Sequence, residues 1–200
     1  MEQKHIIVFD VWGDRALFTR PEFAAERVTY DVPTPTAMQG VAQSIYAKPE
    51  FDTEVIAIEV LQRGRKEAYR GNFVKSKANQ SLTPIDITAD RTQRASTILR
   101  DVAYRVRLQL LANEHTDDLA KHFSIFRKRL DKGRCFQRPY LGCREFAAFF
   151  SHPREGIEPI SWSEELGLLL TGFQQRDPIG VPIFSRAWVD HGCVKWEPLC

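Results

Sequence analysis

The stretch from Thr97 to Leu110 reads TILRDVAYRVRLQL, and along it apolar side chains alternate with polar ones. Such alternation predicts a long strand with one buried face. A few residues later, Thr116 is followed by Asp117 and Asp118, which is typical of a helix start because a hydroxyl at the N-cap and negative charge in the first turn both favour it. The sequence therefore predicts a long strand followed by a helix in this part of the chain.

The helix that starts at Thr116 is predicted to run to Asp131, with Gly133 ending it. Its apolar face is formed by Leu119, His122, Phe123, Phe126 and Leu130, and the other faces carry positive charge. From Cys135 to Phe150 the chain is rich in aromatic residues and is broken by proline and glycine. We expect a strand with a bend or bulge there.

Upstream of the long strand, alternation predicts strands over residues 5–12 and 26–32. A short helix should begin with Thr34 as N-cap and Pro35 in the first helical position, and end near Tyr46, before Lys48 and Pro49. Its apolar face would consist of Met38, Val41, Ala42 and Ile45. A hairpin is expected from strands over 51–61 and 65–75, and a polar loop over 76–90.

The predicted order is strand, helix, hairpin, strand, helix, strand. This order is typical of an α+β domain of the ferredoxin-like (RRM-like, split β-α-β) kind, which we expect to occupy residues 1–150. Short apolar segments at 168–170, 183–189 and 194–196 predict a small C-terminal antiparallel β domain over residues 151–200.

Composition limits the class of protein. The 200 residues are 43% hydrophobic and 27% charged, as in ordinary globular domains. No apolar run approaches the roughly 20 residues of a membrane-spanning helix, and the first residues lack a signal-peptide pattern, so we expect a cytoplasmic protein that does not enter a membrane. The cysteines, at 135, 143, 193 and 200, are expected to be reduced; they are spaced more widely than zinc ligands usually are, so zinc is a minority interpretation.

Charge is distributed unevenly along the chain. The net charge is only +2, but residues 121–144 carry +7, residues 63–77 carry +5 and residues 151–200 carry −3. Such segregation suits a surface that binds a polyanion such as RNA, because phosphates respond to local potential. A solvated, ion-paired face is the alternative. The candidate RNA-binding residues are Arg127, Lys128, Arg129, Lys132, Arg134, Arg138, Arg144, Lys75 and Lys77.

Common catalytic motifs are missing from the sequence. The glycines fit neither a P-loop nor a dinucleotide fingerprint, no serine has a nucleophile elbow, and no spacing indicates a metal cluster, so we expect no cofactor and no metal site. If the basic segment holds RNA, His122 could move a proton while Lys121 stabilises charge on the phosphate. The alternatives are a packed core histidine and a solvated lysine.

Several blocks of sequence carry a resemblance. They are ALFTRPEF (16–23), ERVTY (26–30), VPTPT (32–36), IYAKPEF (45–51), KHFSIFRKRLDKGRCFQRPYLGCREF (121–146) and IFSRAWV (183–189). Together they resemble the CRISPR-associated Cas-five proteins of subtype I-C (the Dvulg subtype). The resemblance implies a RAMP-superfamily protein with a ferredoxin-like domain and a small C-terminal β-sheet domain.

The resemblance also implies a function. A protein of this family would cleave the CRISPR repeat transcript at its stem-loop without metal, remain on the 5′ tag of the crRNA, and partner other subunits of the type I-C effector complex. Its catalytic residues would be Tyr46, Lys121 and His122, with a 2′,3′-cyclic phosphate as product. A non-catalytic RNA-binding subunit of such a complex is the alternative, and in that case Tyr46 is an aromatic residue packed at a helix end.

Overall fold

The computed structural model describes residues 5–23, 26–74, 87–174 and 180–199. Its elements are β1 (Ile6–Ala16), β2 (Arg27–Val28), α1 (Pro35–Ile45), β3 (Phe51–Gln62), β4 (Arg65–Val74), α2 (Ile87–Asp90), β5 (Arg91–Ala112), α3 (Leu119–Asp131), β6 (Phe149–Ser151), β7 (Glu164–Gln174), β8 (Val181–Asp190) and β9 (Cys193–Pro198). A mostly antiparallel sheet combined with helices confirms the predicted α+β class.

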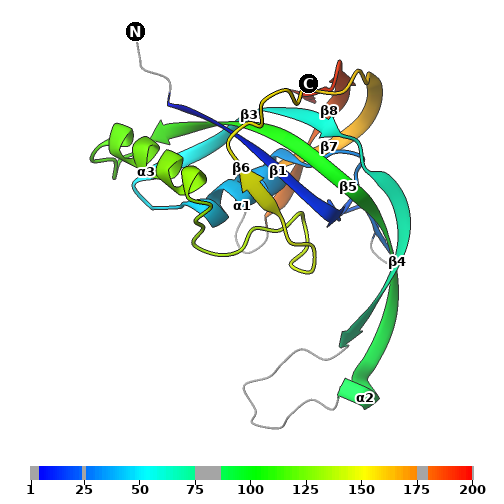
Figure 1. Ribbon diagram of the computed structural model, residues 1–200. Coiled ribbons are helices and arrows are strands. Elements are labelled where there is room, and N and C mark those ends of the chain that lie inside the picture. The colour runs from blue at the N-terminus through cyan, green and yellow to red at the C-terminus, as the bar shows by residue number, and fades with distance from the viewer. Residues whose placement is uncertain (1–4, 24–25, 75–86, 175–179, 200) are drawn as a thin grey trace.

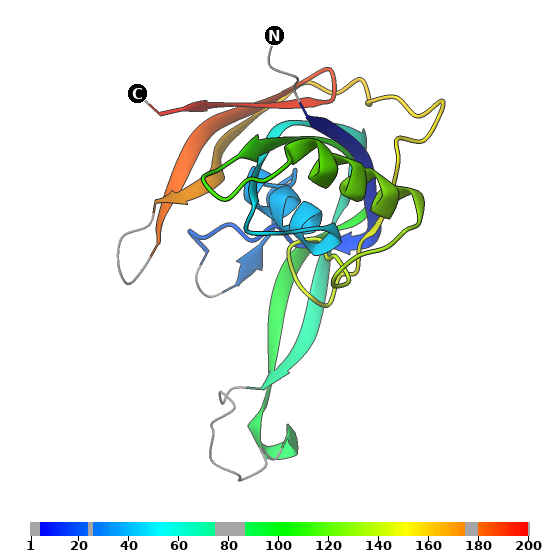
Figure 2. The ribbon, with the colours of Figure 1, turned by 90° about the vertical axis from the view of Figure 1, so that its left-hand side faces the viewer.

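Within the described residues, one nine-stranded sheet runs in the order β6-β1-β5-β3-β9-β8-β7, with β2 and β4 pairing with β5 beside this path. β5 is the central strand, because it pairs antiparallel with β1 on one side and with β3 on the other. The first half of β5 continues beyond the body of the protein and pairs with β4, and Figures 1 and 2 show this pair as a long arm with α2 near its end.

The predicted hairpin over 51–75 is wrong in its pairing. β3 and β4 do not pair with each other; they follow one another along the same side of β5, with Gln62 opposite Ala103 and Arg65 opposite Arg100. Gly64 lies between them, and a Cβ atom there would fall within 3 Å of the side chains of Val102 and Leu99. The Arg63-Gly64 pair therefore marks a close approach to β5, and not a reversal of the chain.

Helices α1 and α3 lie side by side over one face of the sheet (Figure 2). Between the helices and the sheet lies the main core. Fully buried side chains come from β1, β5 and both helices, among them Phe9, Tyr104, Leu108, Met38, Ile45 and Phe126. Burying each such side chain contributes about 1.5–3 kcal/mol, so this layer fixes where the ends of the two helices meet.

The start of α1 agrees with its prediction. The hydroxyl of Thr34 accepts a hydrogen bond from the backbone N–H of Ala37 at 3.1 Å, and Pro35 occupies the first turn. The predicted apolar face is buried, and the helix ends at Ile45 with Tyr46 as its C-cap.

The predicted start of α3 is wrong by a few residues. The N-cap is Asp118, whose carboxylate accepts from the backbone N–H of Lys121 at 3.1 Å. Thr116 is used elsewhere, because its hydroxyl accepts from the N–H of Asn113 and donates to the carbonyl of Glu50, each at 2.7 Å. The loop before α3 is thereby tied to the loop after α1.

Two further strand predictions need correction. Of the segment 26–32 only Arg27–Val28 is a strand, and of 135–150 only its last residues join β6. The loop between α3 and β6 passes beside the end of β1, where the N–H of Leu17 donates to the carbonyl of Leu141 at 3.0 Å. Gly142 has a φ of +84°, and a Cβ atom there would collide with the carbonyl of Leu17, so this close approach of the loop to the end of β1 requires glycine.

The three C-terminal strands are antiparallel as predicted, with β7 paired to β8 and β8 to β9. They join the rest of the sheet through β9, which pairs with β3 at Ile58 and Glu59. No helix in the described part of the chain is long and apolar enough to cross a bilayer.

Candidate active site

Tyr46 lies where α1 ends, and its backbone N–H still donates to the carbonyl of Ala42 at 3.0 Å. Its ring packs against Phe51 and edge-on against Phe126, with centroids 5.6 and 6.3 Å away. Only 4% of Tyr46 is exposed. The helix end and the aromatic neighbours therefore hold the phenol in one orientation.

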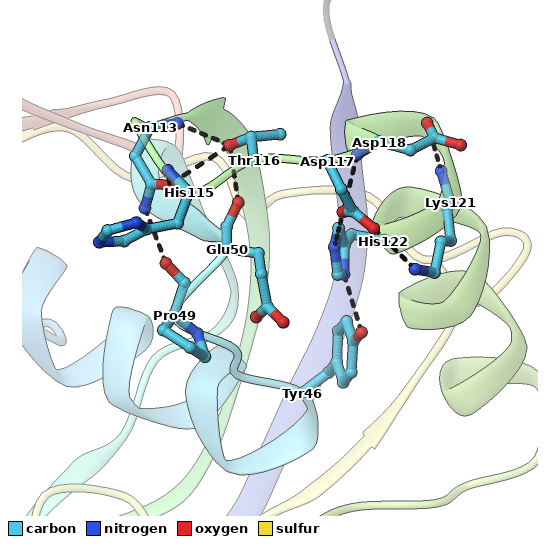
Figure 3. Close-up of polar contacts among 10 residues, drawn as sticks. All are labelled: Tyr46, Pro49, Glu50, Asn113, His115, Thr116, Asp117, Asp118, Lys121 and His122. Carbon is cyan, nitrogen blue, oxygen red and sulfur yellow. Dashed lines mark hydrogen bonds and ion pairs between the residues drawn. The ribbon is translucent and has the colours of Figure 1, made fainter.

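His122 lies in the first turn of α3 and is 3% exposed. Its Nδ1 is 2.9 Å from the hydroxyl of Tyr46, and its Nε2 is 3.0 Å from Oδ1 of Asp117 (Figure 3). The ring also packs on Phe51, with centroids 5.1 Å apart. Both ring nitrogens are thus engaged, one with the buried phenol and one with a carboxylate at the surface.

Lys121 completes the cluster. Its Nζ donates to Oδ2 of Asp117 at 2.9 Å, and the side chains of Lys121 and Asp117 are 53% and 54% exposed. Tyr46, His122, Asp117 and Lys121 therefore form a continuous chain of polar contacts that runs from the interior to the surface, as Figure 3 shows. The three predicted catalytic side chains are brought together at the meeting point of α1 and α3.

Asp117 is a member of this cluster that the sequence reasoning missed as a site residue. In the sequence, Asp117 indicates only negative charge near a helix start. The signal that was available is its spacing of four residues from Lys121, which favours an ion pair at a helix start. Its contact with His122, five residues along, depends on the loop that precedes α3.

Electrostatics in the cluster follow from these contacts. Hydrogen bonds from Lys121, from the backbone N–H of Asp118 and from His122 hold the pKa of Asp117 well below its usual range. The carboxylate of Asp117 in turn raises the pKa of Lys121. Burial raises the pKa of Tyr46, and the Arg129 cation opposes this only in part. At neutral pH the cluster thus holds an ionised carboxylate, an ammonium and a neutral phenol.

Glu50 lies beside the cluster in the loop after α1. The loop is fixed through its carbonyl oxygens, since Thr116 donates to that of Glu50 and Asn113 Nδ2 to that of Pro49 at 3.0 Å. One carboxylate oxygen of Glu50 is buried without a hydrogen-bond partner among the described residues, and the charge contributes to the raised pKa of Tyr46.

The predicted RNA-binding residues divide into groups. Arg129 is engaged inside the fold: it donates from Nη1 to the carbonyl of Ile45 at 2.9 Å, and its guanidinium lies 5.0 Å from the Tyr46 ring centroid. Arg127 lies over the ring of Phe123. The remaining described candidates are exposed, namely Lys128, Lys132, Arg134, Arg138 and Arg144. Lys75 and Lys77 lie outside the described residues.

The loop with the exposed arginines lies next to the cluster. The backbone N–H groups of Phe136 and Gln137 both donate to the carbonyl of Ser44, two residues before Tyr46. Further along the same loop, Arg138 and Arg144 line a pocket of about 230 Å³. A basic loop therefore contacts the end of α1 that carries Tyr46.

Known proteins share this α+β fold. Residues 6–170 match the family model described as CRISPR-associated protein (Cas_Cas5), named Cas_Cas5d. The chain belongs to this family, which confirms the resemblance found in the sequence.

Two curated relatives are named CRISPR pre-crRNA endoribonuclease Cas5d. The one from Thermus thermophilus is 42% identical over 161 residues, covering 80% of this chain and 69% of the relative. The one from Mannheimia succiniciproducens is 33% identical over 210 residues, covering 94% and 93%. The matched region covers more than two thirds of the length of each relative.

Solved structures show the same fold. A crystal structure described as a CRISPR-associated protein aligns with a TM-score of 0.72 at 24% identity, covering 96% of this chain and 91% of that one. A chain of a CRISPR RNA-guided surveillance complex aligns with a TM-score of 0.52 at 12% identity, covering 96% and 89%.

Proposed function

We propose that this protein is an endoribonuclease that cuts CRISPR repeat transcripts into crRNA. The observation that carries the proposal is the chain of contacts from Tyr46 through His122 and Asp117 to Lys121, placed beside an exposed basic loop. Two relatives that cover most of this chain are named for the same activity. The catalytic roles of Tyr46, Lys121 and His122 are part of the proposal.

The reaction uses the nucleophile that RNA already carries. The 2′-oxygen attacks the adjacent phosphorus, the bond from phosphorus to the 5′-oxygen breaks, and the upstream fragment keeps a 2′,3′-cyclic phosphate. Tyr46 orients the 2′-hydroxyl and takes its proton while passing its own proton to His122, and water protonates the departing 5′-oxygen. Lys121 stabilises the negative charge of the transition state, without a metal or cofactor in the proposed mechanism.

RNA has to reach the side chains of Tyr46 and His122, which are 4% and 3% exposed. The exposed ammonium of Lys121 is the first group a phosphate meets, and its partner Asp117 is then exchanged for the phosphate. Asp117 keeps its contact with Nε2 of His122 during this exchange. Hydrogen bonds of a catalytic site often reach their working geometry only in the complex with substrate.

The finer architecture is also proposed. β1, α1, β3, β5, α3 and β6 follow one another in the chain, and the strands lie in the order β6-β1-β5-β3 with both helices on one face. This arrangement supports a ferredoxin-like, split β-α-β domain in residues 1–150. Residues 151–200 would then form the small β domain around β7, β8 and β9.

After cleavage we expect the protein to keep hold of the 5′ tag and to join the other subunits of a type I-C effector complex in the cytoplasm, where the transcript is made. The likeness to a chain of an RNA-guided surveillance complex supports a fold suited to that role. A non-catalytic RNA-binding subunit is the second candidate, and the near-complete burial of Tyr46 and His122 is the observation in its favour.

A repeat hairpin RNA incubated with the protein in excess EDTA decides between the two candidates. We expect cleavage that leaves a 2′,3′-cyclic phosphate, and no cleavage of a hairpin with a 2′-deoxy nucleotide at the scissile position. His122→Ala and Lys121→Ala should slow single-turnover cleavage about 10²- to 10⁴-fold while binding changes little. Binding without any cleavage by the wild type supports the non-catalytic subunit, and normal cleavage of the 2′-deoxy hairpin overturns the mechanism.

A further inference from the structure

We propose that Asp117 is a positioning residue that determines which ring nitrogen of His122 carries the proton, and so makes His122 able to accept a proton through Tyr46. The inference rests on the endoribonuclease activity proposed above. Its basis is geometric: Oδ1 of Asp117 lies 3.0 Å from Nε2 of His122, while Oδ2 lies 2.9 Å from Nζ of Lys121.

The position of the proton follows from what each partner can donate. An ionised carboxylate has no proton to give, and the contacts with Lys121 and the backbone of Asp118 keep Asp117 ionised. Nε2 of His122 must therefore be the donor in the 3.0 Å contact. In the neutral ring the other nitrogen, Nδ1, is then an acceptor, and the hydroxyl of Tyr46 donates to it at 2.9 Å.

The opposite tautomer would be unsuited to the reaction. With the proton on Nδ1, an unprotonated Nε2 would face the carboxylate of Asp117, and His122 could not take a proton from Tyr46. With Asp117 in place, the proton of the 2′-hydroxyl passes to the Tyr46 oxygen as the Tyr46 proton passes to Nδ1. The resulting imidazolium keeps its Nε2–H on Asp117, whose negative charge stabilises it.

Other charged groups surround this relay. Glu50 comes from the loop after α1, Lys121 from the start of α3, and Arg129 from later in α3 across the Tyr46 ring. Just before β1, the titratable side chain of His5 packs edge-on against Phe123, the residue after His122. Among the charged groups around His122, Asp117 is the one that the structure shows in hydrogen-bond contact with Nε2. Its removal should therefore have an effect on His122 that the removal of another nearby charge does not reproduce.

The test compares Asp117→Asn with Asp118→Asn. Both remove one negative charge at the same helix start, and asparagine caps a helix about as well as aspartate. For Asp117→Asn we expect single-turnover cleavage at saturating RNA to fall by about 10²-fold or more, with RNA binding unchanged or tighter because a repulsive charge is gone. For Asp118→Asn we expect the wild-type rate.

A pH–rate profile provides a readout that a purely structural role would not move. Losing the carboxylate disfavours the imidazolium, so the acidic limb of the Asp117→Asn profile should move to lower pH, and Asp117→Glu should restore it in part. All variants are assayed where circular dichroism shows them folded. A wild-type rate for Asp117→Asn, an equal loss in Asp118→Asn, or an unmoved limb each overturns the role of Asp117. If the wild-type protein does not cleave the hairpin at all, the proposed function is overturned instead.

Discussion

An experiment can decide whether the Arg129 side chain contacts RNA or stabilises the fold. Charge pattern alone places it among the RNA contacts, whereas the structure shows it donating to the carbonyl of Ile45 at 2.9 Å and lying 5.0 Å from the Tyr46 ring centroid. Ile45 is the last residue of α1, and carbonyls at a helix end lack partners within the helix. The guanidinium therefore stabilises the helix end that carries Tyr46.

The magnitude for Arg129→Ala follows from the lost contacts. A hydrogen bond from a charged group contributes about 1.5–3 kcal/mol, and a cation–π contact at a partly exposed site about 0.5–1 kcal/mol. Because Arg129 is only half-buried, we expect the free energy of unfolding to fall by about 2–3 kcal/mol. For a chain of this length that corresponds to a melting temperature lower by roughly 5–10 °C.

Lys128→Ala is the matched control, since Lys128 is the preceding residue and is exposed. Thermal unfolding followed by circular dichroism, and hairpin binding at several salt concentrations, are measured for both variants. We expect Arg129→Ala to lose stability and cleavage rate, and Lys128→Ala to keep its stability. If Arg129→Ala is as stable as the control and lowers the salt slope of RNA binding by about one, Arg129 is an RNA contact and the reasoning is refuted.

The remaining predictions concern the basic loop and a buried phenol. Arg134→Glu or Arg138→Glu should weaken hairpin binding and flatten its salt dependence, whereas Lys195→Glu in the acidic segment 151–200 should not; unchanged slopes in filter binding would place the RNA elsewhere. Burial raises the pKa of Tyr104, and its hydroxyl has no partner among the described residues. Above about pH 10 the unfolded state releases the Tyr104 proton, whereas the folded state retains it. The free energy of unfolding therefore keeps its full value with respect to Tyr104 below about pH 10 and falls as the pH rises above it. Tyr104→Phe should add about 1 kcal/mol near neutral pH and reduce the alkaline decline in urea unfolding; a less stable variant would contradict this.

Locally encoded features of the fold could be predicted from the sequence. The start of α1 depends on Thr34 and Pro35, which act on backbone groups within a few residues, and it is found as expected. The pairing of β3 and β4 could not be predicted in this way. Both strands pair with β5, and the tight approach of Gly64 to Val102 that separates them depends on residues far along the chain.

The site shows the same division. Tyr46 and His122 are 76 positions apart, and the resemblance to a known family, not spacing, brought them into one hypothesis. Arg129 and Ile45 are 84 positions apart, so no local pattern distinguished this arginine from its exposed neighbours. Asp117 lies close to Lys121 in sequence, but its contact with His122 depends on the loop that Thr116 ties to Glu50 through one hydrogen bond.

The environment of Tyr46 constrains how a proton can leave the 2′-hydroxyl. Burial raises the pKa of Tyr46, and the nearby Arg129 compensates only in part, so a phenolate is disfavoured in this site. Tyr46 acting as a base alone would have to hold that charge between the rings of Phe51 and Phe126. Because His122 Nδ1 lies 2.9 Å from the hydroxyl, the proton can pass onward as it arrives, and the positive charge that results lies next to Asp117. In the proposed mechanism, the aromatic burial that disfavours a Tyr46 phenolate is thus the reason for assigning the final proton to His122.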